Sequence, residues 1–172
     1  LDAMNDFYIH ENGNAYRGMH PLAEAATTRW EGARTCVAKF LHAAKSESIV
    51  FTKSATESLN LVAHSLGETF KKGDIVVLSI LEHHSNIVPW MQLKEKKGIE
   101  IRWIHCDDEG ELDQKEYDDA LATGHVKLVS ISAQSNVLGV RPPLKEMIKK
   151  AHDAGALVCI DAAQRIAHGV IN

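Results

Sequence analysis

The chain has 172 residues, of which 45% are hydrophobic and 24% are charged, a balance typical of a globular protein with a sizeable core. Its net charge of -4 offers no basic field for nucleic acid, and no apolar run approaches the roughly 18 residues that a membrane span needs. No basic-then-apolar leader opens the sequence, so secretion is not indicated.

Helices and strands are predicted in alternation along the chain. Residues 1–4 have the pattern of the middle of a helix, and Pro21 suits a first helical position. The helix that follows carries apolar residues at steps of three and four, which predicts one buried stripe. The predicted helices are 21–44, 54–66, 86–97, 113–121 and 144–154, and the predicted strands are 49–52, 74–80, 99–105, 126–132 and 156–160.

The strands indicate the fold class. Several are continuous apolar runs, which are typical of parallel strands buried on both faces, and residues 157–160 are expected to be fully buried. Five strand–helix alternations predict an α/β fold with a mostly parallel sheet and helices on both faces. Ligands of such sheets bind at the carboxyl ends of the strands, so the residues that follow each strand are the candidates.

The first strand end suggests an anion site. Ser54 and Glu57 have the spacing of a capping box, which is sufficient to start a helix and need mean nothing more. Alternatively, the helix N-terminus offers free N–H groups to a phosphate, Ala55 allows close approach, and Thr56 adds a hydroxyl. Neither the dinucleotide-binding nor the nucleoside-triphosphate-binding glycine motif is present.

Three further strand ends carry polar residues. His83 or His84 could lie flat against a planar heterocycle, or both could be surface residues, and strand geometry does not choose between them. The amides of residues 134–139 could make a specific contact or form an ordinary turn. Asp161 could pair with a protonated ring nitrogen or cap a helix. Together these features describe one ligand with a phosphate, a flat ring and a cationic nitrogen.

The cysteines carry no metal or disulfide pattern. Cys36, Cys106 and Cys159 have no regular spacing and no C-x-x-C pair. This argues against a disulfide framework and a structural zinc site, so we expect no metal and a reducing compartment, the cytoplasm.

The order and spacing of these motifs match a known family. The sequence resembles the cysteine desulfurases and selenocysteine lyases, pyridoxal 5'-phosphate (PLP) enzymes of the class V aminotransferase-like group, and is most similar to the branch that serves iron–sulfur cluster assembly. The matching stretches are 14–20 (Asn-Ala-Tyr-Arg-Gly-Met-His), 51–63 (Phe-Thr-Lys-Ser-Ala-Thr-Glu-Ser-Leu-Asn-Leu-Val-Ala), 82–90 (Glu-His-His-Ser-Asn-Ile-Val-Pro-Trp), 135–139 (Ser-Asn-Val-Leu-Gly), 151–156 (Ala-His-Asp-Ala-Gly-Ala) and 161–164 (Asp-Ala-Ala-Gln).

The resemblance implies a PLP-dependent transferase of fold type I and a set of roles. Ala55 and Thr56 stand where the family binds the cofactor phosphate. His83 stands where a histidine stacks on the ring, which makes it the catalytic candidate. The other implied cofactor-binding residues are Asn136 and Gln164, toward the phenolic oxygen, and Asp161, toward the pyridinium nitrogen.

The resemblance also implies a reaction and a domain organisation. L-cysteine or L-selenocysteine would be the substrate, L-alanine and an enzyme persulfide the products, a sulfur-acceptor protein the partner, and a homodimer the assembly. Residues 1–20 would be a segment near the active site, and residues 21–172 part of the PLP-binding large domain. The sequence is expected to be truncated at both ends.

Departures from the family pattern limit this inference. No lysine stands in the Ser-x-His-Lys context that holds the cofactor, and no cysteine matches the persulfide position. Ala162 stands where many relatives have glycine, and Ala167 replaces the usual proline before His168. We therefore expect weak or no PLP binding and no turnover by these residues alone.

Two alternatives stay open at this point, and a third is disfavoured. The chain could come from another class V aminotransferase or lyase, or it could be a truncated binding module without catalysis. A plain nucleotide-binding α/β domain is disfavoured because the glycine fingerprint is missing.

Overall fold

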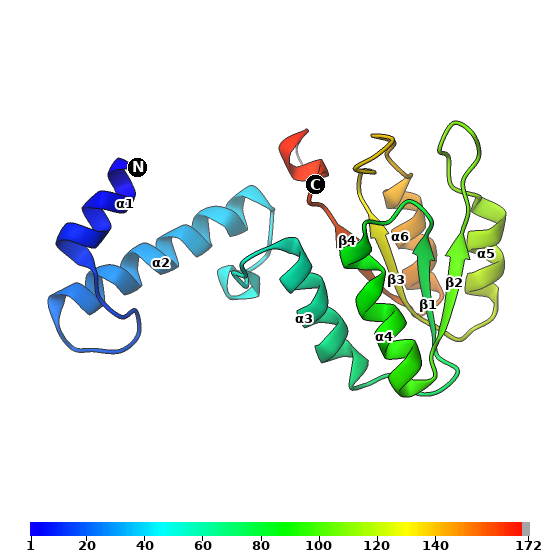
Figure 1. The fold of residues 1–172 in the computed structure, drawn as a ribbon, viewed down its shortest axis with the longest axis horizontal. Coiled ribbons are helices and arrows are strands. Elements are labelled where there is room, and N and C mark those ends of the chain that lie inside the picture. The colour runs from blue at the N-terminus through cyan, green and yellow to red at the C-terminus, as the bar shows by residue number, and fades with distance from the viewer. Residues whose placement is uncertain (170–172) are drawn as a thin grey trace. The chain divides into compact units, whose positions relative to one another are not determined.

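The computed structural model describes residues 1–169 and contains two compact units, one formed by Leu1–Phe51 and one that begins at Thr52 (Figure 1). The last three residues of the predicted large domain, 170–172, lie outside the described residues. None of the helices within residues 1–169 combines the length and the apolarity that crossing a bilayer requires.

The first unit is helical. Its elements are α1 (Asp2–Asp6), a π-helical turn (Phe7–Glu11), α2 (Pro21–Phe40) and a 3-10 turn (Ser46–Ser48). The helix α2 begins where the sequence predicts, with Pro21 in its first turn and the side chain of His20 accepting a hydrogen bond from the N–H of Ala23 at 3.3 Å. A Pro at that position costs nothing, since its missing N–H would have no partner inside the helix.

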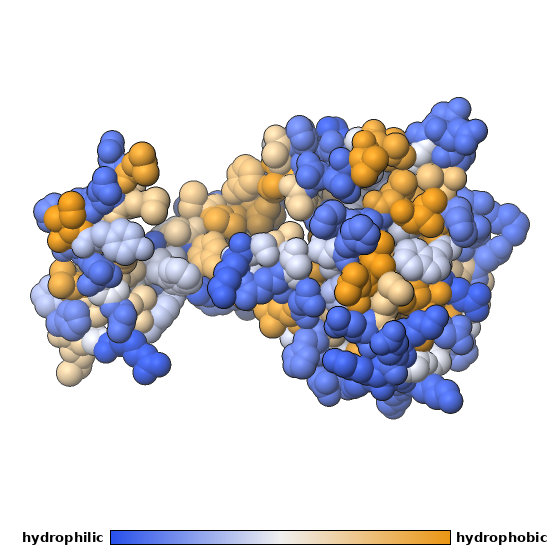
Figure 2. Space-filling model, in the orientation of Figure 1, coloured by the Kyte–Doolittle hydropathy of each residue, from blue (hydrophilic) through white to orange (hydrophobic). Residues whose placement is uncertain are grey.

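The predicted buried stripe of α2 is wrong. Its large members remain open, with Trp30 43% and Phe40 56% exposed, and the buried positions are the small residues Ala23, Ala26 and Ala38. Only two short helical turns precede α2 in its unit, too little surface to cover its apolar residues. Figure 2 shows hydrophobic residues at the surface along this helix.

The predicted strand 49–52 is also wrong. No strand within residues 1–169 pairs with this segment, and Val50 is 66% exposed. The ring of Phe51 packs edge-on against Trp30 with centroids 5.1 Å apart. Of the apolar side chains in this segment, Phe51 therefore packs inside the helical unit and not in a sheet.

The second unit contains a parallel four-stranded sheet of order β2-β1-β3-β4. Helices connect the strands in sequence, as expected for parallel neighbours, so the predicted fold class is confirmed. The strands are β1 (Ile75–Ser79), β2 (Glu100–Ile104), β3 (Val126–Ser132) and β4 (Leu157–Asp161), and the helices are α3 (Ala55–Gly67), α4 (Val88–Lys97), α5 (Gln114–Ala122) and α6 (Leu144–Asp153).

Both faces of the sheet are covered, so the sheet has two cores. Successive residues of β1 point to opposite faces. Val76 and Leu78 pack with Trp90 of α4, and Val77 packs with Tyr117 of α5. All of these side chains are fully buried, which explains why the strand is apolar without alternation.

The expectation that residues 157–160 are fully buried is wrong. Leu157 is 53% exposed, and Val158, Cys159 and Ile160 are half-buried. Within residues 1–169 β4 pairs only with β3, so it is an edge strand there and lacks the second neighbour that full burial requires. Asp161, the last residue of the strand, is nevertheless buried.

Tyr117 makes the stability of this unit sensitive to alkaline pH. Its hydroxyl donates to the carbonyl of Met147 at 2.7 Å, and burial raises the pKa of Tyr117 to about 12. The folded state therefore holds the proton more tightly than an unfolded tyrosine with a pKa of about 10. The contribution is complete below pH 10 and is lost as the pH rises toward 12, by about 2–3 kcal/mol of unfolding free energy.

Urea unfolding of the wild-type chain and Tyr117→Phe across this pH range measures that loss. The stability advantage of the wild type should shrink above pH 10 and should stay constant below it. Tyr8→Phe, at a tyrosine that is 63% exposed, serves as the matched control for general alkaline destabilisation. A pH-independent difference between wild type and Tyr117→Phe would contradict the assignment.

Candidate functional site

Polar side chains are buried at one edge of the sheet. This edge is formed by the carboxyl ends of the parallel strands, and in such sheets it is the place where ligands bind. The buried polar and charged residues are Ser79, Glu82, Ser85, Asn86, Ser130, Ser132, Ser135 and Asp161. All of them belong to β1, β3, β4 or the segments that directly follow those strands.

A pocket of about 340 Å³ opens at this edge. It brings together all six site residues that the sequence predicts, from three different strand ends and one helix start. The residues around it are Ser54, Ala55, Thr56, His83, Ser85, Ser132, Gln134, Asn136, Asp161, Ala163 and Gln164. Their roles toward a ligand stay a prediction.

The start of α3 forms one end of the pocket. One half of the predicted capping box is present, since Ser54 Oγ accepts from the N–H of Glu57 at 3.2 Å, whereas Glu57 Oε2 accepts from the N–H of Lys53, the residue before the N-cap, at 2.6 Å. The N–H groups of Ala55 and Thr56 have no hydrogen-bond acceptor inside the helix, because no helical carbonyl lies one turn before them, and they point out of its N-terminal end. Since both residues are exposed, the helix start can bind an anion with two N–H donors and the positive end of its dipole.

His83 lies on a short turn after β1. Its Nδ1 accepts from the N–H of Ser85 at 3.2 Å and lies 2.8 Å from Ser85 Oγ. The ring itself is exposed, whereas Ser85 beneath it is buried. The adjacent His84 does not line this pocket. Of the two histidines, the one that the resemblance singles out thus lines the pocket, and its role toward a ring stays a prediction.

Asp161 is the buried carboxylate of the site. Its Oδ1 accepts from the N–H of Ala163 at 2.9 Å, so the side chain shapes the turn after β4 as well as lining the pocket. No ion pair within residues 1–169 involves Asp161. A cationic group of a ligand would compensate a buried carboxylate of this kind.

Two amides complete the rim. Asn136 lies in a turn that Ser135 shapes, because Ser135 Oγ accepts from the N–H groups of Val137 and Leu138 at 3.3 and 3.2 Å. Gly139 closes the turn with a φ of 73°, a conformation that favours glycine. Gln164 precedes a 3-10 turn (Arg165–Ala167). The loop after β3 is thus a tight turn that presents an amide to the pocket.

A buried hydrogen-bond network that no sequence motif predicted lies next to His83. Glu82 and Asn86, which flank that histidine, are 7% and 0% exposed and are joined by a hydrogen bond of 2.8 Å. Serines of β1 and β3 complete it. The signal was available, since Ser130 and Ser132 interrupt a strand that is otherwise apolar apart from Lys127.

Neither Cys159 nor Cys106 is arranged as a nucleophile at the pocket. Burial, followed by the negative charges of Asp161 and Glu82, raises the pKa of Cys159, and its contact with Ser130 offsets this in part. A thiol with a raised pKa is a poor nucleophile. The backbone of Cys106 forms an isolated antiparallel β-bridge with that of Leu112, and this residue does not line the pocket.

Among residues 1–169, no group of three or more metal-ligating side chains lies together.

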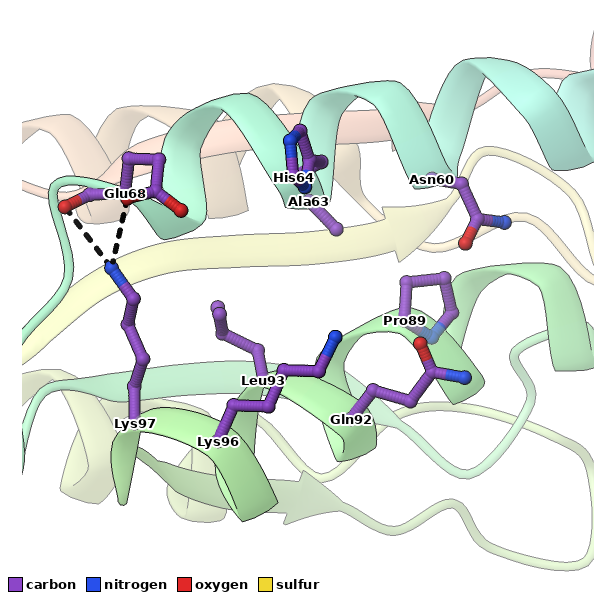
Figure 3. A pocket seen from close by; sticks show the side chains of 9 residues that line it. All are labelled: Asn60, Ala63, His64, Glu68, Pro89, Gln92, Leu93, Lys96 and Lys97. Atoms are coloured by element: carbon purple, nitrogen blue, oxygen red, sulfur yellow. Dashed lines mark hydrogen bonds and ion pairs between the residues drawn. The ribbon is translucent and has the colours of Figure 1, made fainter.

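A second hollow lies elsewhere in this unit. A groove with a volume of about 280 Å³ lies between α3 and α4. Figure 3 shows the Lys96 and Lys97 side chains at its border. Lys97 Nζ is engaged with Glu68, 3.2 Å from its carbonyl oxygen and 3.5 Å from Oε2. The groove lies between helix surfaces, away from the strand ends, and carries no buried carboxylate.

Comparison with known proteins agrees with the motifs. The aminotransferase class-V family model matches residues 1–172. A cysteine desulfurase of Dickeya dadantii is 44% identical over 100% of this chain and 42% of its own length. A probable cysteine desulfurase of Pyrococcus abyssi is 42% identical over 98% of this chain and 41% of its own length.

Solved structures give the same result. The apo cysteine desulfurase of Thermococcus onnurineus matches with a TM-score of 0.93 and 43% identity, over 99% of this chain and 42% of that one. The cysteine desulfurase CsdA of Escherichia coli matches with a TM-score of 0.83 and 33% identity, over 97% of this chain and 42% of that one. The chain thus spans about two fifths of these relatives, and it belongs to the aminotransferase class-V family.

Proposed function

We propose that this chain is the cofactor-binding part of a cysteine desulfurase and that the pocket at the strand ends binds PLP. One observation carries the proposal: the six residues singled out by their motifs surround a single pocket although they are spread from position 55 to position 164. Relatives that carry the name cysteine desulfurase over the whole chain support the choice of reaction within the family.

The donor set fits the cofactor. Ala55 and Thr56 offer helix-start N–H groups and a hydroxyl to the phosphate, Asn136 and Gln164 offer amides to the phenolic oxygen, and Asp161 offers a buried carboxylate to the ring nitrogen. The exposed ring of His83 offers a flat surface to the heterocycle. Bound there, PLP supplies an electron-accepting ring for chemistry at the α-carbon of an amino acid.

The residues of the chain then have distinct tasks. Asp161 holds a proton on the ring nitrogen, since an opposite charge nearby favours the protonated form. The start of α3 orients the cofactor through its phosphate. We assign to His83 the catalytic role in this chain, through the imidazole nitrogen that Ser85 leaves unengaged.

The substrate and partners follow from the family. We propose L-cysteine or L-selenocysteine as the substrate and a sulfur-acceptor protein as the partner for iron–sulfur cluster assembly. A solved relative, SspA in complex with cysteine, matches with a TM-score of 0.85 and 26% identity over 95% of this chain, which supports an amino acid of this kind. Three free cysteines support a reducing compartment, the cytoplasm.

The assembly is proposed to be a homodimer. The large apolar side chains of α2 are exposed, Trp30 and Phe40 among them, and several exposed apolar residues on one helix support a protein contact there. We also propose that residues 1–20 lie near the active site in the assembly and that residues 21–172 belong to the PLP-binding large domain.

Binding of a cofactor analogue tests the proposed site. Titration of the chain with 4'-deoxypyridoxine 5'-phosphate, which lacks the reactive aldehyde, should shift the amide signals of Ala55 and Thr56 in NMR spectra. Without its phosphate, the same ring should bind at least about tenfold more weakly, since a charged hydrogen bond contributes about 1.5–3 kcal/mol. NMR is suited to the weak affinity that we expect.

Thr56→Val and Thr69→Val form a matched pair for this titration. Thr56→Val preserves shape but removes a hydroxyl at the pocket, whereas Thr69 is exposed outside the pocket, just beyond the C-terminal end of α3. Only the first change should weaken binding. Equal affinity of the phosphorylated and unphosphorylated rings would refute the assignment of α3 as the phosphate site.

A further inference from the structure

The carboxylate of Glu82 is buried among neutral donors. Its Oε1 accepts from Ser79 Oγ at 2.5 Å, and its Oε2 accepts from Asn86 Nδ2 at 2.8 Å and Ser132 Oγ at 2.7 Å. No ion pair within residues 1–169 includes this carboxylate. Burial of a carboxylate lowers the stability of the fold, and an apolar side chain of similar size would avoid this loss. A buried glutamate at this position is therefore better explained by the groups that its hydrogen bonds hold in place.

Asn86 extends this network across the sheet. Its Oδ1 accepts from Trp90 Nε1 at 3.2 Å and from Ser130 Oγ at 2.6 Å, while its Nδ2 donates to Glu82. The two residues therefore tie the turn after β1 to α4 and to two positions of β3. Because the acceptor atoms of both side chains are engaged, the network has one preferred arrangement.

His83 lies on the turn that this network holds. Its carbonyl accepts from the N–H of Asn86 at 2.8 Å, and its Nδ1 accepts from the N–H of Ser85 at 3.2 Å. A backbone N–H can only donate, so Nδ1 carries no proton in this arrangement and the neutral ring is protonated on Nε2. Within residues 1–169, Nε2 makes no hydrogen bond.

We propose that Glu82 and Asn86 are positioning residues that fix His83 at the pocket with its Nε2–H side free for the reaction. This role rests on the proposed function of His83, but the arrangement of the turn can be tested without any ligand. Glu82 acts through the geometry of its hydrogen bonds and not through its charge. An isosteric amide should therefore replace it, whereas a methyl group should not.

The first readout is the tautomer of His83 in the ligand-free chain. Spectra that correlate imidazole protons with both ring nitrogens distinguish the two neutral forms, and His83→Asn assigns the signal. Wild type and Glu82→Gln should show the Nε2–H form, because the amide oxygen of the introduced glutamine can still accept from Asn86 and Ser132. Glu82→Ala should show a mixture of tautomers. Glu95→Ala, at an exposed carboxylate of α4, should match wild type.

The second readout is affinity for 4'-deoxypyridoxine 5'-phosphate. Glu82→Ala should weaken it about tenfold to a hundredfold, or about 1.4–2.7 kcal/mol, because His83 would no longer be held at the pocket, and Glu82→Gln should restore it. If Glu82→Ala fails to fold by circular dichroism, Ser132→Ala takes its place. Removal of one of three donors to Glu82 should then shift the His83 signals in the same direction by a smaller amount.

The two readouts separate this proposal from the proposed function. A wild-type chain that binds the analogue without shifts at Ala55 and Thr56 but shows the expected tautomer pattern overturns the cofactor site and leaves the positioning role intact. Binding that persists while Glu82→Ala, or Ser132→Ala in its place, leaves the His83 tautomer unchanged overturns the positioning role alone. Failure of Glu82→Gln to restore what a folded Glu82→Ala loses would also overturn it, since charge and not geometry would then matter.

Discussion

Trp90→Ala is expected to lower the free energy of unfolding of the sheet unit by about 3–5 kcal/mol. The side chain is 0% exposed and packs against Val76, Leu78 and Leu128 on one face of the sheet. The substitution removes a large apolar surface and also leaves Asn86 with one donor fewer. Since small domains are stable by about 5–15 kcal/mol in total, the urea midpoint followed by circular dichroism should fall clearly.

One further variant separates the loss of packing from the loss of the hydrogen bond, and a second serves as a control in the helical unit. Trp90→Phe keeps most of the ring but loses the N–H that reaches Asn86, so a loss of about 1–2 kcal/mol is expected. Trp30→Ala removes a tryptophan that is 43% exposed in the helical unit and should leave the sheet unit unchanged. A Trp90→Ala chain within about 1 kcal/mol of wild type would contradict the central place of this residue in the core.

Asp161→Asn is expected to weaken binding of 4'-deoxypyridoxine 5'-phosphate about tenfold to a hundredfold. The amide keeps the oxygen that accepts from the N–H of Ala163, so the turn after β4 should remain. What is lost is the buried negative charge, which would otherwise pair with the protonated ring nitrogen.

Asp153→Asn is the matched control for this charge removal. Asp153 is exposed at the end of α6, pairs with Lys149 at the surface and does not line the pocket. Its substitution should leave the affinity unchanged, which isothermal titration or NMR titration can measure alongside Asp161→Asn. If both variants bind the analogue as tightly as wild type, Asp161 does not contact the ring nitrogen.

Much of the sheet could be predicted from the sequence because its signals are local. The apolar runs near residues 75, 126 and 157 and the alternation near residue 100 each mark a strand, and Gly98 and Gly155 mark helix ends. The pocket could be predicted in outline, since parallel strands bring their carboxyl ends to one edge whatever their order.

What could not be predicted depends on neighbours that a pattern does not name. Residues 49–52 have the composition of a strand, but Phe51 packs on Trp30, and within residues 1–169 no strand pairs with the segment. The run at 157–160 is as apolar as β1, yet its position at the sheet edge leaves Leu157 exposed. The burial of a residue depends on the strand order and on which helices cover the strand, and neither can be predicted from the local sequence pattern.

The network of Glu82 and Asn86 was missed for a related reason. The four-residue step between them predicts that they lie on the same side of a helical turn, but not that Ser132 comes from a distant strand to meet Glu82. Hydrogen bonds that span 44 and 50 residues appear only once the sheet is assembled.

A crystal structure of the chain with 4'-deoxypyridoxine 5'-phosphate tests the central claim most directly. We predict that the phosphate binds the N–H groups of Ala55 and Thr56 and that the ring nitrogen meets the Asp161 carboxylate beside His83. A ligand bound instead by Lys96 and Lys97 in the groove between α3 and α4 would contradict the account.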